Sequence, residues 1–554
     1  MNLDNIDFMK IRLFIIIGLV VVLAGLIIGG MIWKQKAGPS EGLQSAPEGG
    51  ADEAVKTVEI ETGWNAIVTD AITLSSSEVK QKKGEISISL GKHPVLIEKK
   101  GEEIFSSGLN EQFGFFIVEG FYDSEYFSFV SQANAGVVNL GHVFAWDRIE
   151  PEAGNYDFSR PDEIMNAANS AGIKIIPIIS PVRGMPGSQQ ISCGGYKCYV
   201  STELPSGSDL EAFGNMCYEL AKRYKQVEYW MLMNEPNTMA MKYDTKQYAD
   251  MLKKFAEKIR EANPNAKIMA GAAVLNADRD NSGLQLPKFF QEVFSYYNKV
   301  DAFEYHYYDS AYSGDKTSYK NISEITAKIK SQLSSYGINV PIFLETAHCC
   351  LKEGSERPEA VPGKCKGLAV SEEDEAIDLV RRYTTSFVSG IDKIIWIVLR
   401  DGDNGPIYAT SKNGLINEQG KKEKSFYTYQ LLAKKLKGFS SVKKVSENPY
   451  IYEFIVEGKE IYVAWQDDGG TTPLSSTSGT GGATPGPGTG TGGLPGAGKC
   501  GDGICDEVER RTGKCPEDCG GTSGGTLPGA GKCGDGVCDE VEKAHPELCP
   551  EDCQ

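Results

Sequence analysis

Two glutamates, Glu235 and Glu345, each stand at the end of an apolar segment that is typical of a buried β-strand. Glu235 lies in YWMLMNEPN, and Glu345 closes VPIFLE. A pair of carboxyl groups brought together in this way can split an acetal, because one acid protonates the leaving oxygen while the other carboxylate meets the developing positive charge. The acid must keep its proton near neutral pH, and a neighbouring carboxylate favours this by raising its pKa.

Amide, hydroxyl and aromatic groups occupy similar places in or after other apolar segments. His306 and Tyr308 share one face of VDAFEYHYY, because side chains alternate along a strand. Aromatic faces can stack on sugar rings and exclude water. The alternative is that His306 is a hydrogen-bonded histidine in the core and that the two tryptophans merely fill the core. The candidates for contacting a substrate are Asn234, His306, Tyr308, Trp146 and Trp396.

These residues belong to a regular alternation of short apolar strands and amphipathic helices. Strands are expected at residues 113–118, 136–144, 173–179, 227–233, 267–274, 300–308, 340–345 and 393–399. Helices are expected between them, for example at 209–226, 246–262, 374–388 and 424–437. Such alternation indicates an α/β protein with a parallel sheet, and eight units favour a closed (β/α)8 TIM barrel over an open doubly wound sheet. In a barrel the carboxyl ends of all strands meet on one rim, which would bring the candidates together.

The motifs resemble those of glycoside hydrolase clan A, in particular its family 39-like and family 5-like members. The resemblance lies in YWMLMNEPN, PIFLET, WDRIEPEAGNYDF, the His-x-Tyr of the sixth strand and GLINEQGKKEKSFYTYQLLAKKLKGF. It implies a barrel that hydrolyses β-linked glycosides with retention of configuration and requires no cofactor for catalysis. It also implies that strands from both ends of the barrel segment can build a β-sandwich.

The resemblance assigns a role to each matching residue. Glu235 would be the acid/base, Glu345 the nucleophile, and Asn234 a contact of the sugar 2-hydroxyl. Tyr308 would hydrogen-bond the nucleophile. The sugar pocket would be lined by residues that include His306 and Trp396.

One position departs from the clan's pattern. Many members place an arginine near the nucleophile, late in the second strand, where this chain has Gly141 followed by His142. The departure keeps open a second class of function, a catalytically inactive barrel that binds glycan or serves in adhesion. Transglycosylation, in which a sugar acceptor replaces water, would use the same residues as hydrolysis.

The N-terminal part predicts a membrane anchor. Residues 13–33 are an uncharged apolar run, and about 20 such residues cross a bilayer. A cleaved signal peptide is the alternative, but the run is long for one and no small-residue cleavage pattern follows it. Flanking charges are nearly balanced, so we place the N-terminus in the cytoplasm because the cysteines need an oxidising exterior. The predicted location is therefore a single-pass protein of the cell membrane with an extracytoplasmic catalytic domain.

The expected organisation follows changes in composition along the chain. We expect a cytoplasmic tail at 1–12, a transmembrane helix at 13–33, a linker at 34–57, accessory β strands at 58–110, the catalytic barrel at 111–438, an accessory β hairpin at 439–467, a Gly/Thr/Pro linker at 468–498 and two Cys-rich repeats at 499–519 and 532–554 joined by a linker at 520–531.

The cysteines cluster at the C-terminus, where the two repeats hold eight of the 14. Each repeat is too small for a hydrophobic core, so disulfides are expected to staple it. Its clustered carboxylates could bind calcium, although a solvated acidic knot is an equal alternative. The candidate calcium ligands are Asp502, Asp506, Asp535 and Asp539. In the barrel segment, Cys193 and Cys198 suit a local disulfide, Cys365 is expected to bond Cys349 or Cys350, and Cys217 is either buried or the remaining partner.

The net charge is −18, which argues against nucleic acid as a partner because phosphate binding needs a basic surface. The expected partners are a carbohydrate substrate and, through the N-terminal helix, a membrane.

Overall fold

The computed structural model describes residues 56–118, 122–123, 125–181, 189–193, 196–200, 204–237, 244–275, 284–308, 317–347, 371–401, 414–417 and 419–467. By its contacts the chain divides into two units, residues 1–471 and 472–554, and all described residues belong to the first. The segment 13–33, the cysteines at 349, 350 and 365, and both Cys-rich repeats with their candidate calcium ligands lie outside these ranges. In the part of the chain that is described, no helix is long and apolar enough to cross a bilayer.

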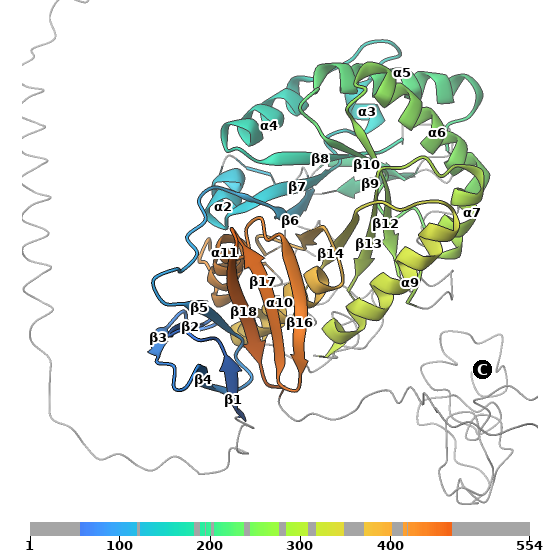
Figure 1. Cartoon of the computed structure of the whole chain (residues 1–554). Coiled ribbons are helices and arrows are strands. Elements are labelled where there is room, and N and C mark those ends of the chain that lie inside the picture. Colours follow the sequence, from blue (N-terminus) through green and yellow to red (C-terminus); the bar gives the residue numbers. More distant parts are fainter. Residues whose placement is uncertain are drawn as a thin grey trace, which may run out of the picture. The chain divides into compact units, whose positions relative to one another are not determined.

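The centre of the described structure is a closed barrel of eight parallel strands (Figure 1). Its strands follow one another round the ring in chain order and are β6 (Asn110–Val118), β7 (Ala135–Gly141), β8 (Lys174–Ile179), β11 (Tyr229–Leu232), β12 (Lys267–Val274), β13 (Ala302–Tyr307), β14 (Ile342–Thr346) and β15 (Lys393–Trp396). The ring closes where β15 pairs with β6. The predicted (β/α)8 barrel is therefore confirmed, and the open doubly wound sheet is wrong.

Helices follow the strands and cover the outside of the barrel (Figure 1). Two of them begin at side-chain caps: Asp244 accepts from the backbone N–H of Gln247, and Ser371 accepts from that of Asp374. The helices are α2 (Tyr126–Gln132), α3 (Trp146–Ile149), α4 (Ser159–Ser170), α5 (Gly207–Arg223), α6 (Thr245–Ala262), α7 (Lys288–Tyr296), the 3-10 turn η2 (Ser318–Lys320), α9 (Asn321–Ser335), α10 (Glu372–Val388) and α11 (Lys424–Lys435). Cys217, in α5, is buried and free.

Two separate hydrophobic clusters lie on the two faces of the barrel sheet. The larger one joins strand residues to helix residues and forms the helix-facing core. The smaller one draws its buried residues from the eight barrel strands alone, so it fills the lumen. Because side chains alternate along each strand, a residue's place in one cluster fixes the direction of its neighbours.

A hairpin that the sequence analysis did not predict follows β8. It consists of β9 (Gln189–Cys193) and β10 (Tyr196–Val200), an antiparallel pair in which Cys193 lies opposite Tyr196 and Cys198 opposite Ile191. The segment contains two glycines and two cysteines, and only a local disulfide was expected there from the sequence.

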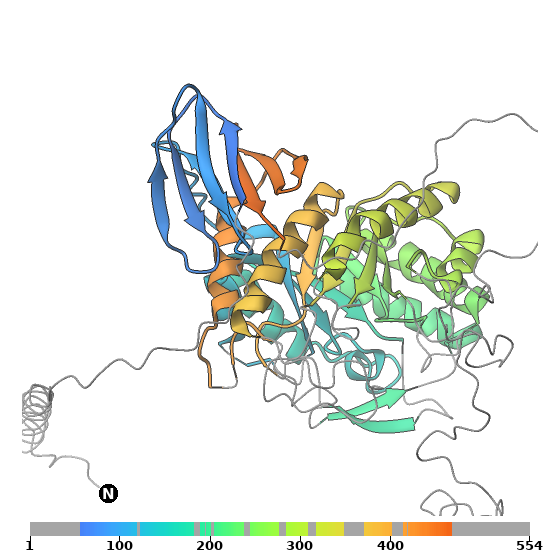
Figure 2. The same ribbon diagram turned by 90° about the horizontal axis from the view of Figure 1, so that it is seen from below.

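A β-sandwich is built from segments on both sides of the barrel in the sequence (Figure 2). One sheet has six antiparallel strands in the order β16-β17-β18-β5-β2-β3, and the other pairs β1 with β4. A third cluster of apolar residues, from both sheets, packs between them. The strands are β1 (Lys56–Glu61), β2 (Ala66–Asp70), β3 (Ser76–Val79), β4 (Glu85–Leu90), β5 (Val95–Lys99), β16 (Ser441–Glu447), β17 (Tyr450–Val456) and β18 (Lys459–Trp465).

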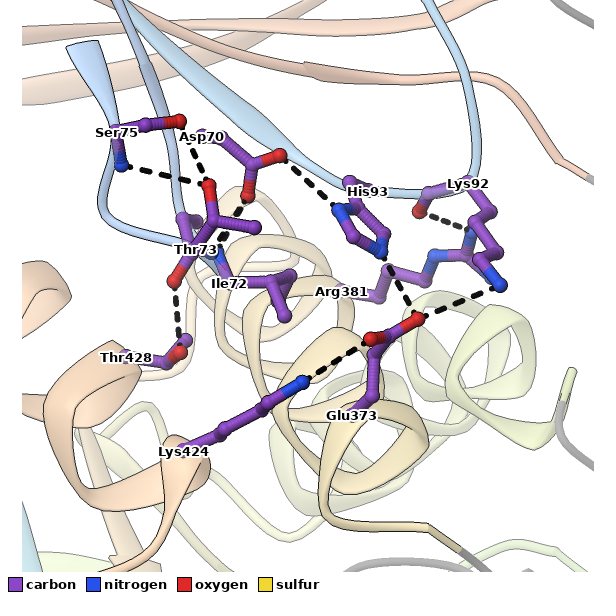
Figure 3. A network of polar contacts seen from close by, with 11 residues as sticks. Asp70, Ile72, Thr73, Ser75, Lys92, His93, Glu373, Arg381, Lys424 and Thr428 are labelled. Atoms are coloured by element: carbon purple, nitrogen blue, oxygen red, sulfur yellow. Dashed lines mark hydrogen bonds and ion pairs between the residues drawn. The ribbon is translucent and has the colours of Figure 1, made fainter. Parts of the chain in front are cut away.

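A polar network joins the sandwich to the outer helices of the barrel (Figure 3). The ring of His93, between β4 and β5, contacts Asp70 of β2 through Nδ1 at 3.0 Å and Glu373 of α10 through Nε2 at 3.1 Å. Lys424 of α11 also pairs with Glu373, at 3.2 Å. The pKa of Glu373 is lowered to about 2, chiefly by the hydrogen bond from His93. The network therefore bridges three elements that are far apart in the sequence.

Candidate active site

The site lies at the carboxyl ends of the barrel strands, where luminal side chains reach the rim. On β13, Ala302 belongs to the luminal cluster, so Glu304 and His306, two and four residues later, also point inward. On β14, Phe343 is luminal, and Glu345 follows it by two. The register of the two strands places His306 beside Glu345 and Glu304 beside Phe343, one layer deeper.

Glu235 reaches the same place from the turn that follows β11. Its backbone is left-handed, with φ 49°, as is that of Met233, with φ 60°. A side chain other than glycine pays about 1–3 kcal/mol in this region, so the surroundings must hold the turn. Asn237 does so: its amide donates to the carbonyl of Val274 at 2.8 Å and accepts from the N–H of Val274 at 3.1 Å. These two bonds fasten the turn to the end of β12.

His306 lies between the two glutamates. Its Nδ1 is 2.9 Å from Oε1 of Glu235 and 3.2 Å from Oε1 of Glu345. The two carboxylate oxygens are therefore at most about 6.1 Å apart, the sum of these distances, which is below the roughly 6.5–9.5 Å typical of inverting glycosidases. The hydroxyl of Tyr308 donates a short hydrogen bond to the same oxygen of Glu345. Glu235, Glu345, His306 and Tyr308 thus form one connected cluster.

The two glutamates differ in their surroundings. The Glu235 side chain is 33% exposed, whereas that of Glu345 is 2% exposed. Burial raises the pKa of Glu345 to about 8; Glu304 and Glu235 add to the rise, and His306 and Tyr308 oppose it. Because Glu345 interacts strongly with the ionisable groups around it, this proton belongs to the buried cluster rather than to one residue. The site therefore retains one shared proton near neutral pH, as a glycosidase acid requires.

The sequence-predicted candidates Asn234, His306 and Tyr308 all lie at this rim. The side-chain oxygen of Asn234 is buried and accepts no hydrogen bond from any described residue, which leaves it able to accept one from a ligand hydroxyl. The pKa of His306 would fall through burial, but Glu345, Glu235 and Glu304 together raise it well above its usual value.

Two predicted candidates, Trp146 and Trp396, do not reach the rim. Trp396 follows Ile395 of the luminal cluster by one residue, so it points into the helix-facing core, where its ring lies 6.0 Å from that of Tyr383. Trp146 packs edge-on against Phe213 of α5 and is 1% exposed. Neither ring presents a face to the lumen, so the predicted sugar contacts of both tryptophans are corrected to core positions. The indole N–H of Trp146 donates to Glu150 at 2.6 Å.

Sequence reasoning missed two buried polar residues beneath the rim, Glu304 and Asn139. Both are fully buried, and the amide of Asn139 on β7 donates to Oε1 of Glu304 at 2.9 Å. The available signal was the two-residue spacing of Glu304 from His306 within an otherwise apolar strand. At Gly141, two residues beyond Asn139, an added Cβ would meet only ordinary contacts at 3.8 Å, so packing does not demand glycine there.

Glu304, His306 and Glu345 each bring one potential metal-ligand atom within 4.8 Å of the others. Ligation would require a ring nitrogen without its proton. Both ring nitrogens of His306 instead face carboxylate oxygens, at 3.2 Å or less from Glu345 and Glu235 and at 3.6 Å from Glu304. We therefore interpret Glu304, His306 and Glu345 as a cluster in which a protonated histidine, rather than a metal ion, offsets the carboxylate charges.

Residues 99–366 match the family model Cellulase (glycosyl hydrolase family 5). The matched segment runs from β6 to β14 of the barrel and contains Glu235 and Glu345. By this match the barrel is that of a glycosidase, and glycosidases of this kind need no cofactor for catalysis. None of the curated proteins matches the sequence.

Several solved structures are similar to the chain. One is a family 39 glycoside hydrolase from the gut symbiont Bacteroides cellulosilyticus WH2, with 14% identity, coverage of 75% of this chain and 87% of that chain, and a TM-score of 0.48. Another is xylanase 10B from Thermotoga maritima, with 13% identity, coverage of 58% and 95%, and a TM-score of 0.40. A third is a beta-galactosidase from the Antarctic haloarchaeon Halorubrum lacusprofundi, with 14% identity, coverage of 60% and 59%, and a TM-score of 0.40. No conclusion about substrate follows from likeness at this level.

Proposed function

We propose that the protein is a retaining glycoside hydrolase of β-linked glycosides or polysaccharides, with Glu235 as acid/base and Glu345 as nucleophile. The observation that carries the proposal is the position of His306 Nδ1, at 2.9 Å from one carboxylate and 3.2 Å from the other. Two carboxylate oxygens that share one ring nitrogen support retention, because an inverting enzyme holds its carboxyl groups far enough apart for a water molecule to act between them.

The reaction then proceeds in two displacements. The carboxylate of Glu345 attacks the anomeric carbon while Glu235 gives its proton to the glycosidic oxygen, so the bond to the leaving group breaks and a glycosyl ester forms on Glu345. In the second step Glu235 removes a proton from water, which attacks the same carbon and releases Glu345. Two inversions give overall retention, and Glu235 ends protonated as it began, with a proton from water in place of the one that it gave to the leaving group.

The surroundings of each glutamate suit its role. Glu345 is buried and accepts a hydrogen bond from the Tyr308 hydroxyl. A donor that is held in place stabilises the ionised carboxylate before it attacks and again when it leaves. Glu235 is more exposed, which suits a group that exchanges protons with a leaving group and with water. The unpartnered oxygen of Asn234 is placed next to Glu235 in the chain and suits a sugar hydroxyl.

The test is a release assay with the full chain on a panel of β-glycans and aryl β-glycosides, beside the variants Glu235→Gln and Glu345→Gln. We expect release by the wild type and a loss of roughly 10³-fold or more in each variant on unactivated substrates. A matched control is Glu375→Gln, because Glu375 is also fully buried but lies in α10, hydrogen-bonded to Ser425. Proton NMR of the first-formed sugar should show the β anomer; the α anomer would contradict retention.

The second candidate function is an inactive glycan-binding or adhesion barrel, which Gly141 favours because it leaves the clan's usual arginine place without a cation. In that case wild type and both variants would release nothing and bind glycan equally well.

We also propose that the enzyme works at the cell surface, anchored by residues 13–33 with the N-terminus in the cytoplasm. The apolar run and the cysteine-rich C-terminus support this location. The full chain should stay with membranes in alkaline carbonate, whereas a chain lacking residues 1–36 should be released; retention of both or release of both would contradict the anchor.

A further inference from the structure

We propose that Glu304 is a positioning residue that keeps His306 doubly protonated, so that a buried cation lies between the two reactive glutamates. The proposal rests on the proposed function for its catalytic meaning, but its central claim concerns one side chain and can be measured without turnover.

Glu304 is placed by β13 directly beneath His306. Both side chains point into the lumen, and both are buried, at 0% and 1% exposure. The neighbouring strand β12 carries a register shift between Ala270 and Ala273, and Gly271 lies there with φ 132°. An added Cβ at Gly271 would sit 2.1 Å from the carbonyl oxygen of Glu304, so only glycine allows β12 to pass this close. The backbone around Glu304 is therefore held tightly.

The carboxylate of Glu304 is directed by Asn139. The amide of Asn139 donates to Oε1 at 2.9 Å, which leaves Oε2 facing Nε2 of His306 at 3.6 Å. Among the described residues, no lysine or arginine pairs with Glu304 or Glu345, and the one basic group beside either carboxylate is the His306 ring. A buried carboxylate without a counter-charge is costly, so Glu304 and His306 depend on each other.

Both ring nitrogens of His306 face carboxylate oxygens. Nδ1 faces Glu235 and Glu345, and Nε2 faces Glu304. A neutral imidazole has one nitrogen without a proton, and its lone pair would then meet a carboxylate oxygen. Moving the single proton from one nitrogen to the other only changes which lone pair faces a carboxylate, so the conclusion does not depend on the assigned tautomer. At 3.6 Å the Nε2 contact is an ion-pair distance rather than a hydrogen bond, so it is the charge of the buried Glu304 that favours the imidazolium over a neutral ring.

The groups that face His306 are Glu235 from the turn after β11, Glu345 from β14, Glu304 from its own strand, and the Tyr308 ring at 5.6 Å. Three carboxyl groups thus surround one base. The raised pKa of His306 agrees with this charge balance, because burial alone would favour the neutral ring. Replacing Glu304 by a neutral residue removes the negative charge beside Nε2, so the effect of burial should lower the pKa of His306.

The consequence for catalysis is a fixed donor at Nδ1. During the two displacements the negative charge shifts between Glu345 and Glu235. The imidazolium N–H lies close enough to stabilise that charge on either carboxylate without a rearrangement of the protein. Glu304 lies one layer below the reacting carboxylates and forms no hydrogen bond with them among the described residues, so it is a positioning residue that acts through the charge on His306 and, more weakly, by raising the pKa of Glu345.

The test is an NMR titration of the full chain with ¹⁵N-labelled histidine, comparing wild type with Glu304→Gln. The chain has five histidines, and the His306→Gln variant identifies the signal of His306 by its loss. We expect both nitrogens of wild-type His306 to stay protonated through pH 7. In Glu304→Gln the pKa should fall by about one unit or more, a tenfold weaker hold on the proton. The control Glu375→Gln should leave the His306 titration unchanged.

A neutral His306 at pH 7 in the wild type, or the same His306 titration in Glu304→Gln, would overturn the proposal. Should Glu304→Gln fail to fold, Glu304→Asp keeps the charge but withdraws it by about 1.5 Å, and an unchanged titration there is equally decisive. In the release assay, Glu304→Gln should move the alkaline limb of kcat/KM to lower pH, and Glu304→Asp should move it in the same direction by a smaller amount. Failure of turnover in the wild type as well as in the variants would refute the proposed function while leaving the NMR result to judge Glu304.

Discussion

Raising the pH through about 8 should switch the enzyme off by removing the proton that the buried carboxyl cluster around Glu345 retains. Burial raises the pKa of Glu345 to about 8, so the proton is bound below that pH and lost above it. Catalysis needs one proton on the pair, because Glu345 must be ionised while Glu235 donates. With an apparent pKa of about 8, roughly half of the molecules hold the proton at pH 8 and about a tenth at pH 9. We therefore expect kcat/KM at pH 9 to be about one tenth of its plateau.

The assay is the pH profile of kcat/KM, which reports the free enzyme. It should be measured with two aryl β-glycosides that share a sugar and differ in the leaving group. A phenyl leaving group needs the proton of the acid, whereas a dinitrophenyl group departs without it. The alkaline limb should therefore be steep for the phenyl glycoside and much weaker for the dinitrophenyl glycoside. Glu375→Gln, which leaves the site untouched, should reproduce both wild-type profiles.

Two results would refute this reasoning. An alkaline limb near pH 5 for the phenyl glycoside would mean that the pair loses its proton like ordinary carboxyl groups. An equally steep limb for both substrates would mean that the titrating group is not the proton donor.

Three further changes test other parts of the structure. His93→Gln should lower the melting temperature by a few degrees near pH 5.5, which corresponds to about 1 kcal/mol of stability. Near pH 9 the decrease should be smaller. An equal decrease at both pH values would contradict an ion pair between a charged His93 and its carboxylate partners. The effect is larger at the lower pH because the pKa of His93 is raised in the folded state, so its proton stabilises the fold fully below pH 6.5 and loses this effect as the pH rises. The pKa of Glu373 is lowered to about 2, so its negative charge stabilises the fold fully above pH 4.5. Asn237→Ala removes both bonds to Val274 and should reduce kcat/KM roughly tenfold with little change in far-UV circular dichroism, and unchanged kinetics would show that the turn needs no fastening. Trp396→Phe should cost about 1–3 kcal/mol in urea unfolding with KM unchanged, whereas a raised KM at full stability would return this side chain to the sugar pocket.

The sequence alone determined the barrel, because its evidence is local. Each strand is a short apolar run bounded by polar segments, and each helix repeats apolar residues every three or four positions. Strands and helices that alternate in this way have few alternatives to a parallel sheet. The turn between β17 and β18 was equally local: Glu457 and Gly458, with φ 52° and 76°, occupy the two left-handed positions that such a hairpin requires.

Only the tertiary structure decided which side chains meet. The phase of a strand, lumen or helix side, is set by closure of the ring, and a shift of one residue separates luminal Ile395 from Trp396. Likewise, the pairing of Glu304 with His306 and with Asn139 depends on register and on contact across the barrel, between residues 165 positions apart in the latter case. A sequence shows the residue types available for proton transfer, but the proximity that raises or lowers each pKa exists only once the barrel has closed.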